Sequence, residues 1–156
     1  MSARTSSEPR RGTAPTQQRP APSAVRRDRR VFVGVVVLAA LSVGGAIISV
    51  VGGLSSTIWE AMGPTGRLSI PIPMMLAQLA AGWLATGQRR RVALVASGLL
   101  ALVEPICIVS GFYDGGYSDP ERSALHVAYQ LLFVATIAVV GVLAALRFVS
   151  LLRRRG

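Results

Sequence analysis

Lysine is absent from this sequence of 156 residues, and cysteine and histidine each occur once. The single cysteine, Cys107, leaves no second thiol for an intramolecular disulfide or a redox pair, which excludes disulfide-exchange chemistry. The single histidine, His126, excludes the histidine clusters that hold iron in membrane desaturases and hydroxylases. Sequence signatures of serine hydrolases, phosphate-binding loops and zinc proteases are also missing. We therefore predict a protein that is not an enzyme and that holds no cofactor and no metal.

Charged residues are rare within four long apolar stretches, which cover residues 31–54, 69–87, 92–113 and 123–146. Glu104 is the only formally charged residue in them. About 20 apolar residues in a helix are enough to cross the hydrocarbon core of a bilayer. The stretches are apolar on nearly all sides, as helices surrounded by lipid are, and the alternation typical of strands is missing. The sequence therefore predicts an all-α membrane protein in which residues 31–150 form a bundle of four transmembrane helices.

The two ends of the chain are polar and basic. Residues 1–30 have no aromatic residue and are rich in Ser, Thr, Pro, Gln and Arg, so they cannot bury enough apolar surface to fold alone. We predict a disordered cytoplasmic tail there and a short basic segment over residues 151–156. The tail is interpreted first as an anchor that sets the topology, and second as a segment that docks a partner.

Arginine is concentrated before the first stretch, between the second and the third, and after the fourth. These residues are Arg26, Arg27, Arg29, Arg30, Arg89, Arg90, Arg91, Arg147, Arg153, Arg154 and Arg155. Arginine beside short loops is retained on the cytoplasmic side, so both termini are predicted to be cytoplasmic. The formal net charge of +10 is then explained by these arginines, which form a basic collar facing anionic lipid headgroups. The charge therefore does not indicate a nucleic-acid-binding surface. Because all 17 basic residues are arginine, we expect a high-GC bacterial gene and a bacterial cell membrane.

Each stretch carries a polar side chain well inside its apolar run. Counted at 1.5 Å per residue from the outer end of each helix, Glu104 and Gln78 lie roughly 13 Å deep, Gln130 roughly 10 Å and Ser42 roughly 18 Å. Lipid offers such groups no hydrogen-bond partners, so we expect them to turn inward and meet. Two interpretations stay open: a hydrogen-bonded layer that sets the helix register, with a protonated Glu104, or a site that handles protons or binds a ligand.

Two further features bear on that choice. His126 and Gln130 are four residues apart and share a helix face, so a relay from outer water through both of them to Glu104 is one possibility. An interfacial hydrogen bond is the simpler interpretation of His126. Pro105 follows Glu104 directly, and a proline inside a helix frees a carbonyl one turn back and produces a kink. Kinked helices often line sites in membrane proteins, although many kinks serve packing alone.

The first stretch carries Gly45, Ser49 and Gly53 at intervals of four residues. A ridge of small residues at this spacing resembles the faces through which transmembrane helices pack closely. We expect the ridge to pack within the bundle first, and against a second copy of the chain or another membrane protein second.

These observations predict a small accessory or interaction component of the membrane. Its expected partners are the lipid bilayer and anionic headgroups at the cytoplasmic face. Association with another membrane protein, or with a second copy of the chain, is the further expectation. The alternative is a small proton-coupled transporter or ligand-binding membrane protein centred on Glu104, with Gln78, Gln130, His126 and Ser42 around it. An enzyme acting within the membrane ranks third.

Overall fold

The computed structural model describes residues 29–63, 68–113 and 123–153, and every regular element in these ranges is an α-helix. The helices are α1 (Arg30–Val51), α2 (Ile58–Ala61), α3 (Ile72–Ala85), α4 (Arg90–Tyr113) and α5 (Ala124–Arg153). The prediction of an all-α fold is confirmed for this part of the chain. The predicted disordered tail lies almost entirely outside the described residues, as does the end of the basic segment over residues 151–156.

Three helices, α1, α4 and α5, are long and apolar enough to cross a membrane, which confirms the prediction of a membrane protein at that level. The second predicted span differs. Its helix, α3, has 14 residues, which is about 21 Å of helix against a hydrocarbon core of about 30 Å. Residues 69–71 are not helical, because Ile70 precedes Pro71 and the residue before a proline is pushed out of the α region.

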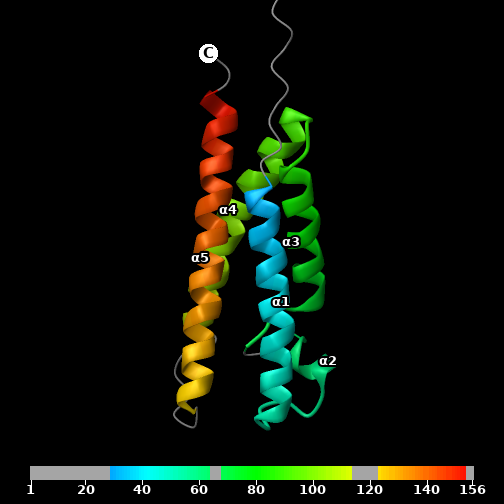
Figure 1. Ribbon diagram of the computed structural model, residues 1–156, viewed down its shortest axis with the longest axis vertical. Helices are drawn as coiled ribbons and strands as arrows, with labels where there is room; N and C mark the ends of the chain where they lie inside the picture. Colours follow the sequence, from blue (N-terminus) through cyan, green and yellow to red (C-terminus); the bar gives the residue numbers. More distant parts are fainter. Residues whose placement is uncertain (1–28, 64–67, 114–122, 154–156) are drawn as a thin grey trace, which may run out of the picture.

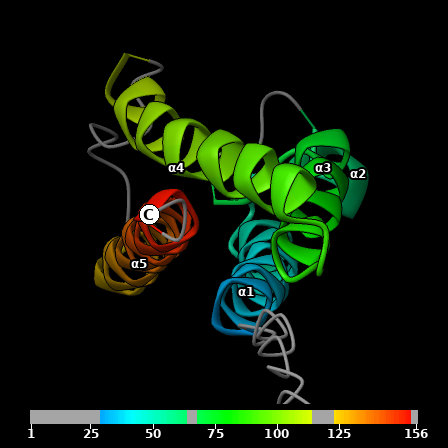
Figure 2. The ribbon, with the colours of Figure 1, turned by 90° about the horizontal axis from the view of Figure 1, so that it is seen from above.

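The four longer helices form a closed ring in which α1 packs against α3 and α5, and α4 packs against the same two helices. Figure 2, which looks along the bundle, shows α3 and α5 apart, with α1 and α4 on opposite sides between them. Helix α1 begins, α3 ends, α4 begins and α5 ends at the same end of the bundle, which is the upper end in Figure 1. We call this the basic end, because Arg30, Arg90 and Arg153 lie in the helix turns there.

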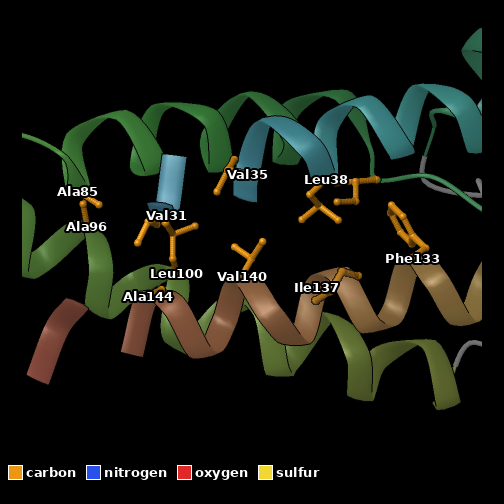
Figure 3. Close-up of a cluster of buried hydrophobic side chains, with 11 residues drawn as sticks. Val31, Val35, Leu38, Ala85, Ala96, Leu100, Phe133, Ile137, Val140 and Ala144 are labelled. Carbon is orange, nitrogen blue, oxygen red and sulfur yellow. The ribbon is translucent and has the colours of Figure 1, made fainter. Parts of the chain in front are cut away.

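The core lies between α1 and α5, with contributions from α3 and α4. Its side chains recur at helical spacing along each helix, as expected for faces that turn away from lipid. Figure 3 shows the α1 and α5 side chains pointing toward each other. The members labelled there are Val31, Val35, Leu38, Ala85, Ala96, Leu100, Phe133, Ile137, Val140 and Ala144.

The connection between α1 and α3 folds back against the middle of α1. The Ile70 backbone N–H donates a hydrogen bond to Ser42 Oγ over 2.7 Å, and the Ile72 N–H donates to the Met62 carbonyl over 3.2 Å. Ser69 Oγ donates to the Ala61 carbonyl. A non-helical backbone inside a membrane protein needs such partners, because lipid supplies none. The short helix α2 and this stretch therefore complete the side of the bundle that α3 is too short to cover.

Helix α5 continues seven residues past the predicted end of the fourth span, from Leu146 to Arg153. Arg90 secures this extension, since its Nε and Nη2 donate to the Leu151 carbonyl over 3.0 and 2.6 Å. The extension places Arg147 inside the bundle instead of in the basic collar, with 4% of its surface exposed.

Candidate functional site

Glu104 of α4 is completely buried, and its partner is Gln78 of α3, which is 4% exposed. Gln78 Nε2 donates a hydrogen bond to Glu104 Oε1 over 3.2 Å. The expected meeting of these two polar side chains is therefore present, and it links α3 to α4. A carboxylate is costly to keep charged in such surroundings, so a protonated carboxyl that accepts from an amide suits this geometry.

The second oxygen of this carboxyl, Oε2, has no hydrogen-bond partner among residues 29–63, 68–113 and 123–153. Gly141 of α5 lies against the Glu104 side chain, since a Cβ added to Gly141 would stand 3.2 Å from Glu104 Cβ and 3.9 Å from Pro105 Cδ. The glycine therefore makes room on α5 for the Glu104–Pro105 pair. Helix α4 continues through Pro105, and the kink at this proline stays a prediction.

The contact between Glu104 and Gly141 shows that Gln130 does not lie at the level of Glu104. Gln130 precedes Gly141 by 11 residues on α5, which is about 16 Å along the helix axis. The expectation that Gln130 and Glu104 lie at one level was wrong, because it assumed that α4 and α5 end at one level. His126 is a further turn away, and its Nδ1 lies 2.8 Å from Ser123 Oγ. In the proposed relay from His126 through Gln130 to Glu104, the last step thus spans about 16 Å along the helix axis, which is more than two side chains joined by one hydrogen bond cover.

Ser42 also lies apart from Glu104. Its hydroxyl binds the Ile70 backbone ahead of α3, whereas Gln78 lies six residues into α3, about 9 Å further toward the basic end. Ser42 therefore secures the connection between α1 and α3 instead of joining the polar pair.

The predicted ridge of small residues on α1 is only partly a helix face. At Gly45 an added Cβ would stand 1.9 Å from the Leu68 carbonyl oxygen and 3.1 Å from Cε1 of Tyr129 on α5, so this glycine packs within the bundle, against both the connection and a neighbouring helix. Ser49 Oγ lies 3.0 Å from Ser55 Oγ. Gly53 lies beyond the end of α1 with φ at 72°, which corrects the predicted span of residues 31–54, and an added Cβ there would meet nothing within 4 Å. Glycine and the turn it permits ended the helix earlier than hydropathy indicated.

Arg147 is a buried charged residue that the sequence interpretation missed. Its Nε and Nη2 are buried and have no hydrogen-bond partner within the described part of the chain. A signal was present: Ile137, Val140, Ala144, Arg147 and Leu151 follow one helix face at spacings of three and four, so the face that buries its neighbours also buries Arg147. The prediction counted Arg147 with the solvated collar because it directly follows Leu146, where the fourth apolar stretch was taken to end.

No three residues of the types His, Cys, Asp and Glu gather to hold a metal ion in the ranges that the structure describes. The site is thus a carboxyl–amide pair between α3 and α4, packed against a glycine of α5. It can hold one proton and fix the register of three helices. No family model, no curated protein and no solved structure matches this chain.

Proposed function

We propose that this chain is a four-span protein of the bacterial cell membrane that acts as an accessory or interaction component and has no catalysis of its own. In this proposal α1, α4 and α5 cross the membrane as single helices, and α3 makes the remaining crossing together with the non-helical residues 68–71 directly ahead of it. The return of the chain supports this, because α1 ends at the end of the bundle opposite to the start of α4 (Figure 1). The internal hydrogen bonds of the non-helical stretch support it as well.

We also propose that the basic end faces the cytoplasm, with both termini on that side. The support is the distribution of charge: arginine lies in the helix turns of the basic end, whereas Glu60 and Trp59 lie at the opposite end. Single cysteines test this in a Cys107→Ser background with a membrane-impermeant maleimide on intact cells. Trp59→Cys should be labelled directly, and Gln88→Cys only after permeabilisation. The reverse pattern would overturn the orientation.

The observation that carries the accessory function is that, within the described residues, the Glu104–Gln78 pair lies apart from Ser42 and His126. A transport site needs a route along which a proton or ligand reaches the carboxyl. The polar residues that could have formed one are engaged elsewhere: Ser42 with the backbone of Ile70, and His126 with Ser123, more than 16 Å of helix away. The pair joins three helices at one level, which is what a structural layer does.

A second candidate function, proton binding within the membrane, is favoured by one specific observation. Glu104 Oε2 is buried and has no partner in the described residues, so the carboxyl keeps an unused position for a donor or acceptor. If the bundle opens transiently, water could reach this oxygen, and Glu104 would then exchange protons with one side of the membrane.

Two substitutions at one position separate the candidates. Glu104→Gln keeps the shape and an oxygen that accepts from Gln78 but cannot release a proton. Glu104→Leu removes the acceptor and leaves Gln78 Nε2 buried and unpaired, a loss of about 1–3 kcal/mol. For the accessory function, Glu104→Gln retains the thermal midpoint in detergent, Glu104→Leu lowers it, and neither changes proton flux into liposomes holding a pH-sensitive dye. Flux that the wild type shows and that Glu104→Gln abolishes without loss of stability would establish the second candidate instead.

A further inference from the structure

A groove runs along the outside of the bundle between α3 and α4, near the turn that joins them. We call it the α3–α4 groove, and its volume is about 450 Å³. It is lined by Ala77, Ala80, Ala81, Leu84, Arg91, Val92, Val95, Ala96 and Leu99. The α3 residues and the apolar α4 residues each follow the spacing i, i+3, i+4, i+7, so each set forms one face of its helix. Small alanine side chains on α3 leave the space unfilled where the two faces diverge.

The groove is apolar along its length and basic at one end. Val95 and Leu99 are 59% and 54% exposed, so they face the surroundings of the bundle and not its core. Arg91 lines the groove next to the α3–α4 turn, and Arg89 is exposed beside it. The intervening Arg90 turns the other way and donates to the Leu151 carbonyl of α5. The ligand that complements this surface has a long apolar part and an anionic head.

The length of the groove favours a lipid over a partner helix. From Arg91 to Leu99 it extends about 12 Å along α4, and from Ala77 to Leu84 about 10 Å along α3. One leaflet of the hydrocarbon core is about 15 Å thick, whereas a partner helix would span about 30 Å. The groove therefore matches the part of an acyl chain nearest the headgroup, within the leaflet at the basic end.

We infer that the α3–α4 groove binds one anionic phospholipid, with an acyl chain against the alanine face of α3 and the phosphate at Arg91. This inference deepens the proposed contact with anionic headgroups and rests on the proposal that the chain spans a membrane. It does not depend on which side the basic end faces. A juxtamembrane arginine contributes about 1 kcal/mol to binding of anionic lipid, which corresponds to about fivefold in affinity.

The test uses the purified full chain in nanodiscs of phosphatidylcholine doped with phosphatidylglycerol that carries a photoactivatable diazirine in its acyl chain. Peptide mapping should place the label on residues 77–84 and 92–99. Arg91→Gln should reduce labelling about fivefold at limiting probe concentration, and Ala80→Phe, which fills the groove, should reduce it at least as much. The matched controls are Arg89→Gln, which removes an adjacent arginine outside the groove, and Ala138→Phe, which adds the same ring on an exposed face of α5.

Three outcomes would overturn the inference. Label spread evenly over the exposed faces of α1 and α5 would show a lipid shell without a site. Equal labelling by a phosphatidylcholine probe would remove the role of Arg91. A cysteine at Ala80 that crosslinks in membranes to another protein, or to a second copy, would make the groove a protein interface. The maleimide experiment on orientation is independent, so a failed lipid site and a failed topology are distinguishable.

Discussion

Gly45 is the position where one added methyl group tests the fold most severely. A Cβ at Gly45 would stand 1.9 Å from the carbonyl oxygen of Leu68 and 3.0 Å from its carbonyl carbon. Both atoms belong to the backbone, so no side-chain rotation relieves the overlap. Gly45→Ala therefore forces the connection between α1 and α3 more than about 1 Å away from α1, since side-chain carbons need about 3.5 Å from their neighbours.

The cost follows from what that connection holds. The Ile70 N–H and Ser42 Oγ bond lies one turn from Gly45, and a displaced connection leaves a buried donor unpaired, at about 1–3 kcal/mol. Overpacking itself costs about 1–3 kcal/mol. The better helix propensity of alanine offsets about 1 kcal/mol. The expected net loss of unfolding free energy is therefore about 1–5 kcal/mol.

Thermal unfolding of the purified protein in detergent measures this loss of unfolding free energy. The matched control is Gly34→Ala on the same helix, where the nearest atoms are side-chain methyl groups, Val140 Cγ2 at 3.2 Å and Leu143 Cδ1 at 3.7 Å. These can shift by a few tenths of an ångström, so the control should remain within about 1 kcal/mol of the wild type. Equal stability of Gly45→Ala and Gly34→Ala would refute the close contact between α1 and the connection.

Two further predictions concern charged groups. Arg147→Met should increase the free energy of unfolding by about 1–2 kcal/mol and raise the thermal midpoint, because it removes buried nitrogens that have no partner in the described part of the chain. The matched substitution of an exposed residue, Arg153→Met, should change stability little. A marked loss of stability in Arg147→Met would show that an anion or lipid phosphate pairs with this side chain in the membrane. At the other end, hydrogen bonds from the Ser56 hydroxyl and then from its N–H lower the pKa of Glu60 below its ordinary 4.5. A carboxyl whose pKa is lower in the folded protein than in the unfolded chain stabilises the fold at pH values above its unfolded pKa. This stabilisation is lost as the pH falls through the folded pKa, so protection of the Ser56 amide from hydrogen exchange should fall in acid. Glu60→Gln should show no such pH dependence, and equal pH dependence in both proteins would contradict the assignment.

Hydropathy was sufficient to predict the class of fold, because helices in lipid must be apolar over a known length. It placed α1, α3 and α4 within a few residues of their bounds. It could not place the end of α5, since the contact between Arg90 and the Leu151 carbonyl holds the last turns of this helix.

The polar residues likewise divide into those whose positions the sequence predicted and those it did not. Gln78 and Glu104 meet as their positions in the sequence indicated, because α3 and α4 are joined by a short turn that fixes their relative level. Gln130 was misplaced because α4 and α5 are joined through residues 114–123, which leaves their relative level free in the sequence. Only the packing of Glu104 on Gly141 reveals it. Arg147 was misplaced because charge, and not helix phase, decided its interpretation.

The measurement that tests the accessory function most directly is crosslinking in native membranes, followed by purification through a C-terminal tag and mass spectrometry. The account predicts a second membrane protein recovered in constant proportion with the wild type and with Glu104→Gln alike. Recovery of this chain alone, or crosslinked only to itself, would contradict the accessory function.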